Sequence, residues 1–94
     1  MNKVILVGRV AETPSDSTNA VSFSVITNSQ DKDPEAHSVT VFKAQPKTAR
    51  QAGRLAAGQL VYVEGNVKFR RVETRERVRY YTEVVASRIG SLSN

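Results

Sequence analysis

The abundance and spacing of valine constrain the fold of this chain more than any other sequence feature. The sequence holds 14 valines against four leucines, and β-branched side chains favour the pleated, half-buried surface of a sheet. In the segment 20–27, Val21, Phe23 and Val25 alternate with serines, which is the period of two typical of a strand with one buried face. A chain of 94 residues can bury only one modest core. We therefore expect one β-rich domain over residues 1–90 and a short flexible end at 91–94.

The same alternation predicts five strands, which cover the segments 3–10, 20–27, 37–43, 59–71 and 79–89. Polar segments at 13–17, 28–36 and 72–78 are expected to be turns or loops, and residues after Ile89 to be frayed. Gly8 and Gly65 lie inside strands, where glycine suggests a bulge or a tight bend. One helix is expected to begin at Pro46, because alanines recur there at helical spacing, and to be capped by Gly58.

Five strands with one helix between the third and the fourth give the element order of the OB-fold, a five-stranded Greek-key barrel. The predicted class is therefore all-β with one short helix. Glycines inside long strands agree with a small barrel, whose strands must bend sharply to close. An SH3-like barrel or a small α+β sheet could share the order, but neither places its helix there so naturally.

The composition argues against several classes of function. The chain has no cysteine and one histidine, His37, whereas zinc sites need several such ligands; for His37 we expect a structural hydrogen bond. No nucleophile–base pair or phosphate-binding glycine loop is evident, so we expect neither catalysis nor a cofactor. No stretch approaches the roughly 20 apolar residues of a membrane span. The expected location is the cytoplasm, in association with the nucleoid.

Positive charge is concentrated in the third quarter of the chain. The net charge is +5, and residues 43–79 alone carry +7, which is typical of a protein that binds a polyanion. Residues 68–81 contain six basic and three aromatic side chains against two acids. Single-stranded nucleic acid needs both cations for its phosphates and flat rings for its bases. The candidate binding residues are Lys3, Arg9, Phe42, Lys43, Lys68, Phe69, Arg70, Arg71, Arg75, Arg77, Arg79 and Tyr80.

Each of these features also has a purely structural interpretation. The charged segment could be a solvated hairpin, with Glu73 and Glu76 paired to Arg77 and Arg75 across it. Phe69 is in register with buried valines, so packing in a core or an interface is at least as plausible as base stacking. Tyr80 and Tyr81 point to opposite faces of a strand, and we favour Tyr80 as the ligand contact. The remaining cations, on the helix, are expected to be solvated: Lys47, Arg50 and Arg54.

Three sequence blocks, at 2–9, 61–65 and 79–85, together resemble the bacterial single-stranded DNA-binding protein family. The resemblance implies an OB-fold that forms homodimers or homotetramers, with single-stranded DNA wound over the outside. It also implies that Phe42 is a base-stacking aromatic and that His37 lies near a subunit interface. The basic positions that match the family are Lys68, Arg70 and Arg71.

The chain departs from that family in three ways. It has no tryptophan, and the positions nearest the family's tryptophans are Asp31, Ala36 and Val72, so charge is expected to carry more of the affinity. The loop at 28–36 is shorter than usual. The sequence ends at Asn94 without the family's glycine- and proline-rich linker and acidic tip; either the protein works without recruiting enzymes through that tip, or the sequence has been cut short.

We therefore expect sequence-independent binding of single-stranded DNA by a homo-oligomer that acts in replication, recombination or repair, with replication or repair proteins as further partners. Two alternatives remain open from the sequence. One is a primosome-type accessory OB protein that acts mainly through contacts with replication proteins. The other is an RNA-binding OB module, which would bind RNA as well as or better than DNA.

Overall fold

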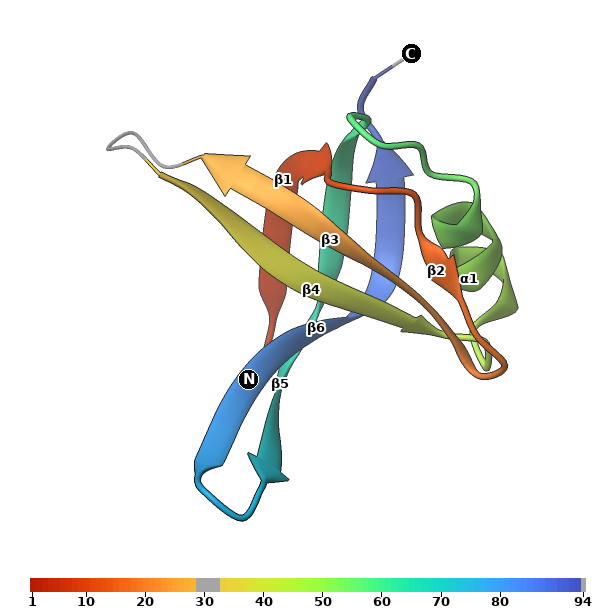
Figure 1. The fold of residues 1–94 in the computed structure, drawn as a ribbon. Coiled ribbons are helices and arrows are strands. Elements are labelled where there is room, and N and C mark those ends of the chain that lie inside the picture. Colours follow the sequence, from red (N-terminus) through yellow and green to blue (C-terminus); the bar gives the residue numbers. More distant parts are fainter. Residues whose placement is uncertain (29–32, 94) are drawn as a thin grey trace.

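The protein, described here by a computed structural model over residues 1–28 and 33–93, is a closed β-barrel with one long hairpin projecting from it (Figure 1). In the described residues the elements follow one another as β1 (Val4–Val10), β2 (Ser15–Asp16), β3 (Ala20–Asn28), β4 (Pro34–Phe42), α1 (Pro46–Gly53), β5 (Leu60–Glu73) and β6 (Val78–Ser91). The sheet order is β1-β5-β6-β4-β3-β2, and β1 also pairs with β3. That extra pairing closes the five long strands into a barrel, which confirms the expected fold class.

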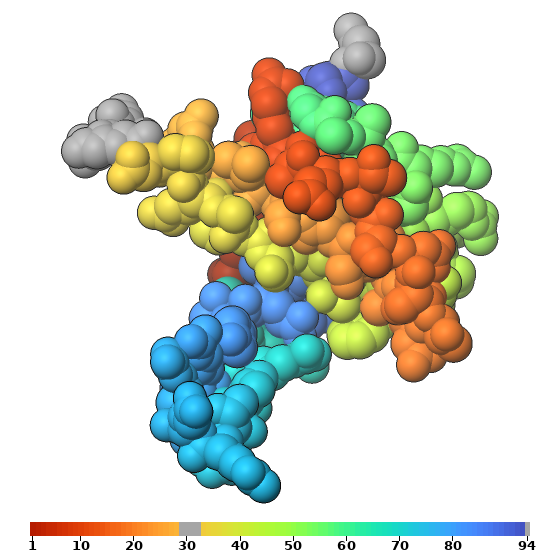
Figure 2. All heavy atoms as spheres, in the orientation of Figure 1, coloured from red at the N-terminus to blue at the C-terminus, as the bar shows by residue number. Residues whose placement is uncertain are grey.

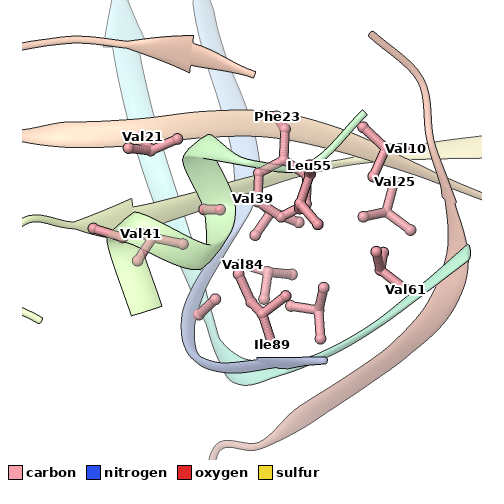
Figure 3. Packing of buried hydrophobic residues seen from close by; sticks show 14 residues of the cluster. Val10, Val21, Phe23, Val25, Val39, Val41, Leu55, Val61, Val84 and Ile89 are labelled. Carbon is pink, nitrogen blue, oxygen red and sulfur yellow. The ribbon is translucent and has the colours of Figure 1, made fainter. Parts of the chain in front are cut away.

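The barrel core includes the alternating residues that the sequence marked in the segment 20–27. Val21, Phe23 and Val25 of β3 are buried, and Val39 and Val41 of β4 lie with them inside the barrel (Figure 3). The helix α1 packs against β3, β4 and β6. It adds three small or branched side chains to the same core: Ala49, Ala52 and, just after the helix, Leu55. The valine-rich pattern is thus explained by a narrow interior with room for few large side chains.

Close backbone approach explains the two glycines inside strands. A Cβ atom on Gly65 would lie 2.1 Å from the carbonyl oxygen of Val85, and the register of β5 against β6 shifts between Glu64 and Gly65. The expected bulge at this position is confirmed. A Cβ atom on Gly8 would lie 2.3 Å from the carbonyl oxygen of Ile26, where β1 passes from β5 to β3. Both glycines therefore permit the barrel to close.

The helix is shorter than the sequence predicted. It ends at Gly53 and not near Gly58, because the amide of Leu55 donates to the carbonyl of Ala52 at 3.2 Å and tightens the last turn. Gly58 lies in the following turn with a φ of +85°, a conformation that favours glycine. Its amide donates to the carbonyl of Val10 at 2.7 Å, so this glycine fixes the connection to β5 and does not cap the helix.

Several strand ends also differ from the prediction. Ser15 and Asp16, within the expected turn, pair with β3 as the short strand β2. With β2 included in the numbering, the helix follows β4, which is the third of the five long strands. β4 begins at Pro34, three residues earlier than expected, since it pairs with β3 along its full length. Of the expected loop at 28–36, residues 29–32 lie outside the described residues. In each case strand pairing extends into polar sequence that has no alternation to reveal it.

The last strand continues past Ile89, so the strand end predicted at that residue is wrong. Gly90 and Ser91 pair with β5, and the amide of Leu92 donates to the carbonyl of Leu60 at 2.9 Å. The amide of Leu60 in turn donates to the hydroxyl of Ser93 at 3.1 Å. The terminus that was expected to be frayed is thus hydrogen-bonded as far as Ser93.

Candidate nucleic-acid interface

The second half of β5 and the first half of β6 leave the barrel together as a hairpin, here called the arm (residues 68–83). It stands away from the body of the molecule as a separate lobe (Figure 2). Its strands pair from Lys68 opposite Glu83 to Glu73 opposite Val78, so they take in part of the expected tip at 72–78. Every residue from 68 to 82 is exposed. The arm therefore presents two open faces and contributes no buried core.

A groove lies on the outer face of β3 and β4, beside the base of the arm. Its volume is about 360 Å³, and small hydroxyl side chains dominate the strand residues that line it: Ser22, Ser24, Ser38 and Thr40. Glu83 of β6 also lines it and accepts a hydrogen bond from the Thr40 hydroxyl at 2.9 Å. Glu12 adds a second carboxylate at the rim. Small hydroxyl groups leave space for an extended ligand and can donate to its phosphates.

Glu83 connects this groove to the arm. Its Oε1 lies 3.6 Å from Nη2 of Arg70, so one carboxylate contacts both a groove hydroxyl and an arm guanidinium. The register of two antiparallel strands shows which of their side chains lie on the same face. The face of the arm that continues the groove, here called the groove face, comprises Lys68, Arg70, Val72, Arg79, Tyr81 and Glu83. The opposite, back face comprises Phe69, Arg71, Glu73, Val78, Tyr80 and Thr82.

The arm keeps most of its positive charge available. Arg70 pairs with Glu83, and Arg71 Nη1 lies 3.3 Å from Glu73 Oε2. The alternative pairing of Glu73 with Arg77 was therefore wrong. Within residues 1–28 and 33–93, no carboxylate lies within ion-pair distance of Lys68, Arg75, Arg77 or Arg79. Four cations thus remain for an anionic ligand, two on the groove face and two at the tip.

The structure brings some of the predicted site residues together and separates others. Lys68, Arg70 and Arg79 share the groove face, and Phe42 lies on the same outer side of β4 as Thr40. Phe69, Arg71 and Tyr80 lie on the back face. Phe69 is 76% exposed, so its interpretation as a core residue of this chain is wrong.

Three predicted cations lie away from the groove. Lys3 Nζ is 3.5 Å from Glu64 Oε1, and Arg9 donates to the carbonyl of Gly58 at 2.8 Å, at the far end of β1. Lys43 is ion-paired with Asp16, beside α1. Each of the three thus has a carboxylate or carbonyl partner, and none of them lines the groove.

Sequence reasoning missed two parts of this surface. It did not include Tyr81, which lies on the groove face, or the hydroxyl side chains of β3 and β4. The alternation of serines with buried residues in β3 was a signal for the hydroxyl groups. No signal within the sequence decided which of the two adjacent tyrosines faces the groove, because that depends on the bulge at Gly65 and on the barrel's curvature.

His37 has the structural role expected for it. Its Nε2 lies 3.0 Å from the hydroxyl of Thr27 on the neighbouring strand, within hydrogen-bond distance. The carboxylate of Glu35 is 3.9 Å from the same nitrogen. In the described part of the chain, no group of three or more His, Cys, Asp or Glu side chains is arranged to hold a metal ion.

A second polar network lies on the outside of β5, in the part of the strand that pairs with β1. The Tyr62 hydroxyl donates to Glu64 Oε1 at 2.7 Å. This hydrogen bond, with Lys3 nearby, lowers the pKa of the Glu64 carboxyl, and the same bond raises the pKa of the Tyr62 phenol. Ile5 and Val7 of β1 expose their side chains beside this network, since they pair with Glu64 and Tyr62. An apolar strip with a polar border is a common feature of protein–protein contacts.

A closed five-stranded barrel is the architecture of the OB-fold, in which one sheet face and the loop between the last two strands bind oligonucleotides or oligosaccharides. In this chain the hydroxyl-lined groove and the cationic arm lie at the corresponding places. The family model described as the single-strand binding protein family matches residues 1–92. The chain therefore belongs to the single-strand binding protein family. No curated protein sequence matches it. None of the helices in the described residues is long and apolar enough to cross a membrane.

Two solved structures resemble the chain over almost its whole length. One is the Plasmodium falciparum SSB in complex with ssDNA, with 24% identity and a TM-score of 0.84, covering 99% of this chain and 96% of that one. The other is Rim1, a mitochondrial single-stranded DNA-binding protein of S. cerevisiae, with 22% identity and a TM-score of 0.82. That match covers 98% of this chain and 95% of the other. At these identities the likeness establishes the shared fold.

Proposed function

We propose that this protein binds single-stranded DNA without sequence preference and protects it during replication, recombination or repair. The observation that carries the proposal is the groove face of the arm, where Lys68 and Arg79, which have no ion-pair partner among the described residues, continue a groove lined by hydroxyl groups. Membership of the single-strand binding protein family supports it, as does the similar fold of a protein solved in complex with ssDNA.

The chemistry of the groove and arm favours recognition of the backbone over recognition of base sequence. Lysine, arginine and hydroxyl side chains contact phosphates, which carry no sequence information. Exposed rings such as Phe42 stack on any base. A flexible single strand can place its phosphates in the groove while its bases turn toward these rings, whereas a duplex keeps its bases stacked inside.

Self-association belongs to the same proposal. Ile5 and Val7 form an exposed apolar strip on β1, and we place a contact between copies of this chain there. A homo-oligomer would present several arms to one DNA strand and thereby increase avidity. The protein would act by binding alone, without catalysis. Its expected location is with nucleoid DNA in the cytoplasm, and replication or repair proteins are further proposed partners.

The test is a titration of the purified protein with fluorescein-labelled oligonucleotides of one length, followed by anisotropy. Oligo-dT and a mixed-sequence strand should bind with affinities within a few fold of each other, and the matched duplex should bind much more weakly. A strong preference for one sequence, or equal affinity for the duplex, would contradict the proposal. Tighter binding of the matching RNA strand would support the RNA-binding alternative instead.

A further inference from the structure

The groove face of the arm contains a second hollow, nearer its tip and separate from the groove over β3 and β4. Its volume is about 330 Å³, at the lower end of the range for small-molecule sites. The residues that line it are Val72, Thr74, Glu76, Arg77, Arg79 and Tyr81. They combine one aromatic ring, one aliphatic side chain and two guanidinium groups. None of the other arm aromatics lines it.

The strand register explains how Tyr81 comes to lie in this hollow. Val72 is directly opposite Arg79, and Arg70 is directly opposite Tyr81. Tyr81 and Val72 are therefore diagonal neighbours on one face, close enough for an aromatic side chain to reach across. Valine is short, so it fills little of the space beside the ring, and Tyr81 remains 46% exposed.

Arg77 lines the hollow from the turn at the tip of the arm, and Arg79 lines it from β6. The amide of Thr74 donates to the carbonyl of Arg77 at 2.9 Å, and the Thr74 hydroxyl donates to the same carbonyl at 3.1 Å. These bonds close the turn and fix the position from which Arg77 leaves the backbone. Glu76 is the one carboxylate in the lining, and neither Arg77 nor Arg79 is ion-paired with it within the described residues.

We propose that this hollow is a nucleobase subsite in which a base of the bound strand stacks on the ring of Tyr81. Arg77 and Arg79 neutralise the phosphates on either side of that base. This proposal rests on the proposed function, since it assigns a binding position to one base of the same DNA strand. The strand would pass from the groove over β3 and β4, along Arg70, to Tyr81, because these all lie on one continuous face.

The competing arrangement would place the base on Tyr80. That ring is more exposed, at 68%, and it lies on the back face with Phe69. Exposure alone would favour it, but the back face does not continue the groove. Its one cation, Arg71, is paired with Glu73, whereas the groove face also holds Lys68 and Arg79, which have no ion-pair partner among the described residues. We therefore assign the base to Tyr81, and Tyr80 provides a matched control one residue away.

The absence of tryptophan allows a direct spectroscopic test. The chain has three tyrosines and no tryptophan, so the double variant Tyr62→Phe/Tyr80→Phe leaves Tyr81 as the sole source of tyrosine fluorescence. Addition of oligo-dT should quench this signal, with a midpoint equal to that of the anisotropy change of a labelled oligo-dT. In the variant Tyr62→Phe/Tyr81→Phe, the signal of Tyr80 should change much less.

Affinity gives a second, independent measurement. Tyr81→Ala should weaken oligo-dT binding by about 5- to 150-fold, the range expected for the loss of one base–aromatic stack. Tyr81→Phe keeps the ring and should bind within about twofold of the wild type, and Tyr80→Ala should have a smaller effect than Tyr81→Ala. Far-UV circular dichroism of each variant checks that the barrel is folded.

Failure of the subsite can be distinguished from failure of the proposed function. If labelled oligo-dT binds but the fluorescence of Tyr81 does not change, the subsite is wrong and the function stands. The same conclusion follows if Tyr80→Ala weakens binding more than Tyr81→Ala does. If the wild-type protein binds no single-stranded DNA at all, both proposals are wrong.

Discussion

At the scale of single residues, glycine decides whether the barrel can close. Gly65 has no room for a side chain, since an added Cβ atom would be 2.1 Å from a backbone carbonyl oxygen and 2.8 Å from the Cα of Ala86. Neither neighbour is a flexible side chain that could move aside. Gly65→Ala should therefore lower the free energy of unfolding by about 1–3 kcal/mol, as overpacking does elsewhere. Urea denaturation followed by circular dichroism measures this change.

Gly53, the last residue of α1, is the matched control for this prediction. Apart from its chain neighbours and the backbone of its own helix, no atom of the described residues lies within 4 Å of an added Cβ there, and its φ is not positive. Gly53→Ala should raise the free energy of unfolding by about 0.4–1 kcal/mol, because alanine loses less entropy on folding. Equal destabilisation by both substitutions would show that close approach at Gly65 is not the cause.

The hydrogen bond between Tyr62 and Glu64 predicts a dependence of stability on pH. It lowers the pKa of Glu64 in the folded protein. Stabilisation from this bond is therefore present above the ordinary glutamate pKa of about 4.3 and is lost as the pH falls through the lower, folded value. Wild type should have a higher urea midpoint than Tyr62→Phe at pH 6, and the difference should shrink toward pH 3. A difference that grows in acid would contradict this.

At the scale of elements, the arm is a two-stranded hairpin, and such a hairpin alone is marginally stable in water. Here its strands are continuations of β5 and β6, which pair along the barrel from Val61 to the bulge. The barrel thus fixes the register of the arm, and register decides which side chains share a face. The arm can then use its exposed surface for binding without contributing to the core.

Removing cations from the groove face should weaken DNA binding and make the affinity less dependent on salt concentration. The double variant Lys68→Ala/Arg79→Ala removes two cations that have no ion-pair partner in the described residues. If both contact phosphates, the log–log slope of affinity against salt for oligo-dT should become shallower by about 1.4. Anisotropy titrations across a salt series measure that slope.

The helix provides the control for the arm. Arg50→Ala/Arg54→Ala also removes two exposed cations, but from the surface beside α1 that lies away from the groove. This variant should keep the wild-type slope. If both double variants reduce the slope equally, charge acts over the whole surface and the groove face has no special role.

At the scale of the whole molecule, the outer surface of β1 is expected to join copies of the chain. Ile5 is 55% exposed on that surface, and a lysine in its place would put a charge into an apolar contact at a considerable desolvation cost. Ile5→Lys should therefore lower the mass measured by sedimentation velocity. Leu92→Lys, at a residue with the same 55% exposure, should leave the mass unchanged. An unchanged mass for Ile5→Lys would exclude this surface as the contact.

The sequence alone determined the architecture and the chemistry of the ligand. Alternation in β3, as at Val21 and Phe23, marks buried faces because side chains of a strand point to opposite sides in turn. The glycine at position 65 marked the bulge, and the cluster of arginines marked the arm. All of these are local signals, since each depends on neighbouring residues along one strand.

Only the tertiary structure decided which residues act together. Arg70 and Arg71 are adjacent in the sequence, yet one faces the groove and pairs with Glu83 while the other faces away and pairs with Glu73. Lys3 and Lys43 are ion-paired with carboxylates from distant segments, which the sequence did not predict. The physical reason is that the bulge and the closure of the barrel set the register between strands, and register determines the face on which each side chain lies.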